Sequence, residues 1–231
     1  MKTWIVAAVE AELGLLRNEL GARTAEVVGG EVVFSGSLGA APLWLGVIGV
    51  GAVSAAFSLG CFISTLGADR VIMVGSGGAL PGSGLDVGDV AIATSEIMAE
   101  LGVCSGPGLG EASPLALQGL RQEIHFDPAL TEALEHSASG GFRVRMGRFL
   151  TVLGVSANLE QAEGRANRFP ALVESMEGFS LALAAQRCGV RAAEVRGVSN
   201  LAGTRDKTRW NLELANERAQ QAVLTYLRRQ S

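Results

Sequence analysis

The chain of 231 residues is 48% apolar, 18% charged and 5% aromatic, and its net charge is −4. This apolar content excludes a disordered chain, and the 31 glycines follow no G-X-Y period, which excludes a collagen. The length and the absence of a linker favour one domain over residues 1–231.

The charge and cysteine patterns exclude several classes of partner. No basic stripe with interleaved aromatics indicates nucleic acid, and Glu10 and Glu12 end the first apolar run too early for a secretion signal or a membrane span. Three distant cysteines and two histidines indicate neither a disulfide nor a metal site. We therefore expect a soluble, cytoplasmic protein without metal or other cofactor.

The predicted elements alternate between strands and helices along the whole chain. Strands are expected at residues 4–8, 32–37, 43–50, 70–74, 89–94, 148–155, 172–176 and 193–198. Helices are expected at residues 10–20, 53–66, 128–136, 159–169, 178–188 and 212–229. This alternation predicts an α/β fold, which we interpret as three α/β/α layers around a mixed, twisted sheet.

The Gly- and Pro-rich stretch 105–122 interrupts the pattern. It contains neither a Walker loop nor a dinucleotide fingerprint. It is either a surface loop or a flap over a ligand, and the sequence leaves both open.

Distinctive polar residues follow four of the predicted strands. They are the acids of Val9–Glu12, the turn Gly75-Ser76-Gly77-Gly78, the stretch Glu174–Gly178 and the pair Ser199-Asn200. In open α/β sheets, ligands bind outside the carboxyl ends of the strands, so we expect these four segments to meet in one crevice.

Each of these residues also has a purely structural interpretation. Glu12 would favour a helix N-terminus, the glycines would serve a tight turn, Glu177 would lie on a solvated helix start, and Asn200 would be a turn residue. The common position at strand ends favours a shared site over four separate coincidences.

These motifs resemble the purine nucleoside phosphorylase/nucleosidase superfamily over nearly the whole chain. The opening strand and acid, residues 5–13, are similar to those of methylthioadenosine/S-adenosylhomocysteine nucleosidases. Residues 74–78 with 85–90 resemble the glycine turn and next strand of that group, and residues 175–178 its Met-Glu ribose motif. The resemblance implies a homo-oligomer, often a dimer, that acts on a small nucleoside.

Within the superfamily the chain is most similar to the futalosine hydrolases. The residues that carry this likeness are 174–178, 194–200, Gly203-Thr204-Arg205-Asp206 and Trp210. Adenine-specific nucleosidases have Ser-Asp where this chain has Ser199-Asn200. The resemblance therefore implies hydrolysis of futalosine with release of hypoxanthine, a step of an alternative menaquinone pathway.

The matched positions imply roles for individual residues. Glu12 would deprotonate the water that attacks C1′, and Glu177 would accept hydrogen bonds from the ribose hydroxyls. Met176 would pack against the sugar, and Ser76, followed by Gly77, would hold water or a ribose hydroxyl.

Asn200 would address the base, because its amide offers a donor to a C6 carbonyl and an acceptor to a protonated N7. Arg205 and Trp210 are candidates for binding an aryl carboxylate at the 5′ end. Alternatively, Arg205 is a solvated surface residue before the last helix, and Trp210 packs in the core.

Three other functions stay open on the sequence. They are a phosphorylase, a nucleosidase directed at adenine nucleosides such as methylthioadenosine or aminodeoxyfutalosine, and a nucleoside-binding member without activity. The first strand–helix junction lacks the glycine-and-arginine phosphate loop of the phosphorylases, and Glu10 and Glu12 place negative charge there.

Overall fold

The computed structural model describes residues 1–104, 112–113, 117–138 and 141–230. The first half of the chain contains β1 (Thr3–Ala7), the 3-10 turn η1 (Glu10–Leu13), α1 (Gly14–Glu19), β2 (Arg23–Val28), β3 (Glu31–Leu38), β4 (Ala41–Val47), α2 (Ala52–Leu66), β5 (Arg70–Ala79), β6 (Val90–Met98), β7 (Val103–Cys104) and β8 (Ala112–Ser113). The second half contains β9 (Glu123–His125), α3 (Pro128–Ser137), β10 (Val144–Thr151), α4 (Leu159–Arg168), β11 (Val173–Ser175), α5 (Gly178–Cys188), β12 (Arg191–Leu201), the 3-10 turn η2 (Lys207–Arg209) and α6 (Leu212–Gln230).

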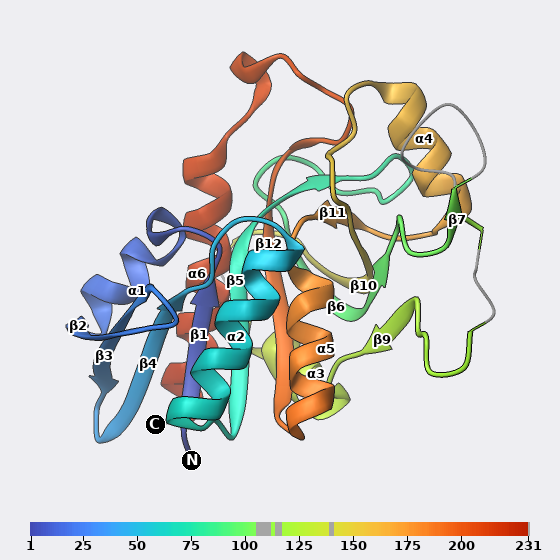
Figure 1. Cartoon of the computed structure of the whole chain (residues 1–231). Helices are drawn as coiled ribbons and strands as arrows, with labels where there is room; N and C mark the ends of the chain where they lie inside the picture. Colours follow the sequence, from blue (N-terminus) through green and yellow to red (C-terminus); the bar gives the residue numbers. More distant parts are fainter. Residues whose placement is uncertain (105–111, 114–116, 139–140, 231) are drawn as a thin grey trace.

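Ten of the described strands form one mixed sheet in the order β11-β10-β6-β12-β5-β1-β4-β3-β2, with β9 on β6. The strands β4, β1, β5 and β12 run parallel in the centre, and β12 meets β6 antiparallel. β11 pairs with β10 and also with β5, so one end of the sheet closes on itself. The parallel strands β1, β5 and β12 point their carboxyl ends to the same side of the molecule (Figure 1), and β11, which runs antiparallel to β5, pairs with the last residues of β5.

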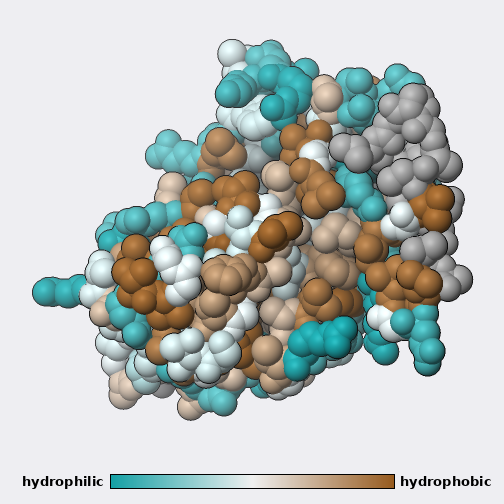
Figure 2. Space-filling view, viewed as in Figure 1, coloured by the Kyte–Doolittle hydropathy of each residue, from teal (hydrophilic) through white to brown (hydrophobic). Residues whose placement is uncertain are grey.

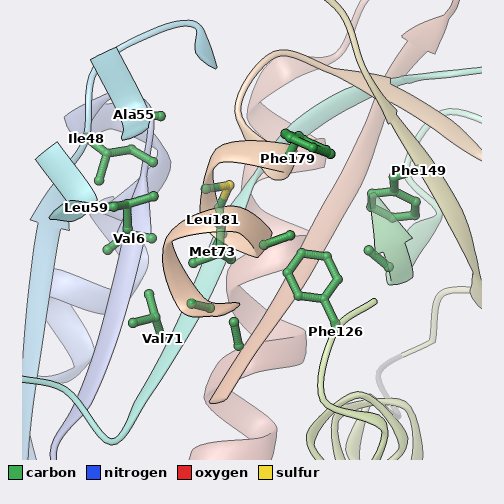
Figure 3. Packing of buried hydrophobic residues seen from close by; sticks show 14 of the residues in the cluster. Val6, Ile48, Ala55, Leu59, Val71, Met73, Phe126, Phe149, Phe179 and Leu181 are labelled. Atoms are coloured by element: carbon green, nitrogen blue, oxygen red, sulfur yellow. The ribbon is translucent and has the colours of Figure 1, made fainter. Parts of the chain in front are cut away.

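Helices cover both faces of the sheet. α2 and α5 lie on one face, where Leu59 of α2 and Leu181 of α5 pack into one core cluster with Met73 of β5 (Figure 3). α1, α3 and α6 pack on the other face, with Leu16, Leu134 and Val223 in a second cluster. The predicted α/β fold with helices around a mixed sheet is confirmed.

Several predicted elements differ in extent from the observed ones, and two of these border the cavity described below. The expected helix over 10–20 begins as a 3-10 turn and becomes α-helical only at Gly14, because the Glu12 side chain turns back to accept a hydrogen bond from the Val9 backbone. The expected strand over 70–74 continues to Ala79, since residues 75–79 pair with β12. The glycines at 75, 77 and 78 are therefore strand residues without positive φ, and the prediction of a tight turn there was wrong.

Four strands, β2 and the short β7, β8 and β9, were not predicted from the sequence. β2 is an edge strand whose residues are exposed except for Val28, so it shows no apolar face to recognise. It joins β3 through Gly29 and Gly30, whose φ angles of 60° and 87° fit a hairpin turn. Of the stretch 105–122, residues 105–111 and 114–116 lie outside the described residues, so the choice between loop and flap stays open.

Gly197 allows α6 to pack directly on β12. A Cβ atom on Gly197 would lie 1.9 Å from the carbonyl oxygen of Ala215, which belongs to the helix backbone. A side chain at this position therefore requires α6 to move away from the sheet.

We predict that Gly197→Ala lowers the free energy of unfolding by about 1–3 kcal/mol, as overpacking against a backbone does. Gly164→Ala is the control: Gly164 is exposed in α4, a Cβ atom there would meet nothing within 4 Å, and alanine should stabilise the helix by up to ~1 kcal/mol. Urea denaturation measures both variants, and equal midpoints would contradict the close approach of α6.

Candidate active site

A cavity of about 220 Å³ opens at the carboxyl edge of the sheet. All seven residues selected from the sequence line it, namely Glu12, Ser76, Gly77, Met176, Glu177, Asn200 and Arg205. They come from η1, β5, the β11–α5 junction, β12 and the segment that precedes η2. The structure thus brings together the segments that the strand-end rule groups.

Glu12 is buried in the wall of this cavity, with 6% of its surface exposed. Oε2 accepts hydrogen bonds from the backbone N–H groups of Ala8 (3.1 Å) and Val9 (3.4 Å). Oε1 accepts from the backbone N–H of Ser76 (3.0 Å) and lies 3.4 Å from the Ser76 hydroxyl. Loop and strand amides therefore fix the carboxylate from both sides.

Burial raises the pKa of Glu12 above its ordinary value. Arg196 and the Ser76 N–H oppose this rise, and the negative charge of Glu177 adds to it. A carboxylate with a raised pKa is a better proton acceptor near neutral pH than an exposed one.

Arg196 lies at the centre of the site and is 1% exposed. Its Nε donates to Glu194 Oε1 (2.7 Å), Nη2 to Glu177 Oε2 (3.2 Å) and Nη1 to the Ser76 carbonyl oxygen (3.2 Å). Burial alone would lower the pKa of Arg196, but Glu194, Glu177 and Glu12 raise it, and the guanidinium stays charged. One buried cation thus hydrogen-bonds two carboxylates and acts through its charge on a third, Glu12.

Arg196 belongs to one of the motifs that carry the family resemblance, but no role was predicted for it from the sequence. The available signal was an arginine inside the predicted strand 193–198. An arginine in a fully buried strand needs carboxylate partners, and Glu177 and Glu194 are close in the chain.

Glu177 is the N-cap residue of α5 and is buried. Oε1 accepts a hydrogen bond from the Gly51 N–H (2.9 Å), and Oε2 accepts from Arg196. The alternative of a solvated helix start is therefore wrong. Met176 precedes it and packs against the third core cluster while it lines the cavity.

Asn200 is half-buried at the other wall. Its Nδ2 donates to the Leu201 carbonyl (3.0 Å), and its Oδ1 lies 2.8 Å from the Ser199 hydroxyl, which donates to it. Since an amide nitrogen carries two hydrogens, one remains for a ligand.

Arg205 and Trp210 line the outer part of the cavity. The Arg205 guanidinium lies 5.1 Å from the centre of the Trp210 ring, and the indole N–H donates to the Thr204 carbonyl (2.8 Å). Trp210 is half-buried at the cavity and is not a core residue, and Arg205 is exposed.

A second buried ion-pair network supports the cavity wall. Glu174 accepts hydrogen bonds from the Ser156 N–H (3.0 Å), the Ser156 hydroxyl (2.7 Å) and Arg165 Nη1 (3.0 Å). Arg165 also pairs with Glu100 at 3.0 Å. These contacts hold Val155 and Ser156 against the cavity, and they were not predicted from the sequence.

In the described part of the chain, no group of three or more His, Cys, Asp or Glu side chains is arranged to hold a metal ion. Cys61 and Cys188 are free thiols outside the cavity lining. No helix of the described residues is long and apolar enough to span a bilayer.

The comparisons with known proteins agree with this architecture. The family model described as Phosphorylase superfamily matches residues 2–228, so the chain belongs to this superfamily. Futalosine hydrolase of Thermus thermophilus is 36% identical over 177 residues, which cover 76% of each chain.

Nucleosidases that act on adenine compounds are also similar. The 5′-methylthioadenosine/S-adenosylhomocysteine nucleosidase of Geobacillus thermodenitrificans is 28% identical over 98% of this chain and 96% of its own. The structure of the corresponding S. pneumoniae enzyme with a transition-state inhibitor has a TM-score of 0.86, with 24% identity and full coverage of both chains. The sequence-based identification of the superfamily and of a nucleosidase-type enzyme is confirmed, and the relatives leave the choice of nucleoside open.

We predict that Arg196→Met lowers the free energy of unfolding by about 3–5 kcal/mol, because it leaves buried carboxylates without their cation. Arg196 lowers the pKa of Glu12, so in the variant this pKa moves further above the unfolded value. An acid whose pKa is higher in the folded than in the unfolded protein lowers the free energy of unfolding as pH rises through this pKa. The destabilisation by Arg196→Met should therefore be larger at neutral than at mildly acidic pH.

The control is Arg191→Met, which breaks the exposed ion pair with Asp127 at 3.0 Å. It should cost under about 1 kcal/mol, with little change between mildly acidic and neutral pH. Urea denaturation at both pH values compares the variants. A similar, pH-independent loss in both would show that Arg196 is not the counterion of this cluster.

Proposed function

We propose that the protein hydrolyses the N-glycosidic bond of a purine nucleoside, with futalosine as its substrate and hypoxanthine as the released base. The observation that carries this proposal is the pair of buried carboxylates Glu12 and Glu177, which line one cavity: Arg196 hydrogen-bonds Glu177, and its charge also acts on Glu12. The futalosine hydrolase relative supports the choice of substrate.

The two carboxylates suit two requirements of the reaction, which are stabilisation of the cationic ribose and activation of the attacking water. As the C1′–N9 bond breaks, positive charge develops on the ribose, and Glu177 binds the ribose hydroxyls while its negative charge stabilises that cation. Glu12 takes a proton from the water whose oxygen bonds to C1′. The electron pair of the broken bond goes to the purine, which takes a proton from solvent at N7.

Asn200 supports hypoxanthine as the base. The free Nδ2 hydrogen suits the C6 carbonyl of hypoxanthine, whereas the C6 amino group of adenine needs an acceptor. Ser199 donates to Asn200 Oδ1 and fixes the side chain in place. A buried mismatch of this kind costs about 1–3 kcal/mol, which corresponds to a roughly ten- to hundredfold preference.

The outer cavity suits the 5′ substituent. The Arg205 guanidinium and the Trp210 ring lie together at 5.1 Å and offer a positive charge and an aromatic face to an aryl carboxylate. A nucleosidase whose substrate carries a small, uncharged 5′ group would not need a cation at this position.

The part of the cavity around Glu12 and Glu177 offers little to a phosphate. Arg196 donates to two carboxylates and a carbonyl, and Glu12 places negative charge beside it. Hydrolysis is therefore favoured over phosphorolysis.

A homodimer is part of the proposal. Val53 and Phe57 of α2 are 82% and 62% exposed, and Val50 at the cavity is also exposed. Figure 2 shows hydrophobic side chains on the face that carries α2. Burial of this face against a second copy of the chain would stabilise a dimer. Sedimentation velocity measures the mass of the particle and so tests for the dimer.

The direct test is a panel of futalosine, aminodeoxyfutalosine, methylthioadenosine and inosine, assayed for the released base with and without phosphate. We expect futalosine to be cleaved fastest and phosphate to have no effect. Futalosine should also exceed inosine, which lacks the aryl carboxylate that Arg205 is proposed to bind. Strict dependence on phosphate, or faster turnover of methylthioadenosine, would refute the proposal.

Glu12→Gln belongs to the same test. Loss of the general base should lower kcat by about 10²–10⁴-fold while nucleoside binding persists. Binding without turnover in the wild-type protein would instead identify a non-catalytic nucleoside-binding member.

We predict that Asn200→Asp shifts the preference toward adenine nucleosides by roughly ten- to a hundredfold. The carboxylate would repel the C6 carbonyl of hypoxanthine and accept from the C6 amino group of adenine. The ratio of kcat/KM for futalosine and aminodeoxyfutalosine measures the shift. Leu201→Ala on the same strand is the control, and an unchanged ratio in Asn200→Asp would remove Asn200 from base recognition.

A further inference from the structure

Two carboxyl groups meet inside the protein, away from the cavity. Glu96 of β6 and Glu194 of β12 are both 0% exposed. A Cβ atom on Gly178 would lie 2.1 Å from Glu96 Oε1 and 2.2 Å from Glu194 Oε2. These two oxygens therefore converge beneath the first residue of α5.

The same two oxygens have no other hydrogen-bond partner among the described residues. The remaining oxygen of each group is satisfied. Thr151 Oγ1 donates to Glu96 Oε2 (2.7 Å) and accepts from the Phe179 N–H (2.8 Å), and Arg196 Nε donates to Glu194 Oε1 (2.7 Å).

Two ionised carboxylates facing each other without water would be strongly unfavourable, whereas one proton between them satisfies both unpaired oxygens. The guanidinium of Arg196 contacts Glu194 and not Glu96. Burial, followed by the charge of Glu194, raises the pKa of Glu96 well above its usual range. The proton therefore belongs on Glu96, which donates to the Glu194 carboxylate.

The charge of Arg196 acts on the pair, and the charges of Glu177 and Glu12 act in turn on Arg196. With Glu96 neutral, the cluster holds the carboxylates of Glu12, Glu177 and Glu194 against one guanidinium. This excess of negative charge suits a site where a cationic sugar forms.

We propose that Glu96 and Glu194 share one proton as a buried acid–carboxylate pair that positions Arg196 and, through it, the Glu177 carboxylate. The effect of this pair on catalysis rests on the proposed function, in which Glu177 binds the ribose hydroxyls. The shared proton itself does not depend on any activity.

Infrared spectroscopy tests the proton directly. At a pH where exposed carboxyl groups are ionised, the wild-type protein should show a C=O stretching band of a protonated carboxylic acid that persists in Glu12→Gln, which removes the other carboxyl group whose pKa burial raises. Glu96→Gln should lose this band. Glu123→Gln, on the neighbouring strand β9, removes a partly exposed carboxylate paired with Arg148 and should retain it. A wild-type protein without the band, or a band that survives in Glu96→Gln, would overturn the proposal.

Kinetics then tests the positioning role. Glu96→Gln keeps a neutral donor to Glu194, so kcat should fall by no more than a few-fold. Glu194→Gln removes the carboxylate that holds Arg196, and kcat should fall roughly ten- to a hundredfold, the effect of losing one charge-assisted hydrogen bond.

Equal losses in the two variants would contradict the assignment of the charge to Glu194. If no nucleoside is cleaved by the wild-type protein, the proposed function fails, while the infrared band still decides whether the pair shares a proton.

Discussion

The site depends on one constraint, which is that the charge of Arg196 is buried in the middle of the sheet. A guanidinium out of water is tolerated only when anions and carbonyl groups take the place of the solvent. Here Glu194, Glu177 and the Ser76 carbonyl do so, and each comes from a different element. The requirement to satisfy one cation therefore fixes β12, β5 and the start of α5 relative to each other.

Glycines make the room that this cluster needs. A Cβ atom on Gly75 would lie 2.5 Å from Arg196 Nη1 and 2.9 Å from Glu12 Oε1, and one on Gly178 would meet the Glu96–Glu194 pair. Neither glycine has a positive φ. The glycine-rich composition of the chain thus serves close packing around charged side chains at these positions, and not only turns.

The central strands, the main helices and the cavity residues could be predicted because they follow strong local patterns. Ala7, Val74 and Val198 belong to apolar runs that lead directly to polar residues, and the strand-end rule then groups those residues. The ion-pair partners could not be predicted in the same way. Glu96 and Glu194 are far apart in the chain, and they lie on β6 and β12, which are neighbours through a tertiary pairing that no local pattern encodes. Likewise, the closure of β11 onto β5 is a tertiary pairing without a sequence signature.

That closure determines where the protein can open. β11 is hydrogen-bonded at both edges and leads directly to Met176 and Glu177, so a local fluctuation that opens this side of the cavity has to break two strand pairings at once. Its opening free energy therefore approaches that of global unfolding. The segment between β12 and α6, which carries Arg205 and Trp210, returns to the sheet through the hydrogen bond from the Asn211 N–H to the Ser199 carbonyl and is largely exposed. Ligand exchange is thereby assigned to the side of the cavity that Arg205 and Trp210 line, while Met176 and Glu177 lie in a rigid and already formed half.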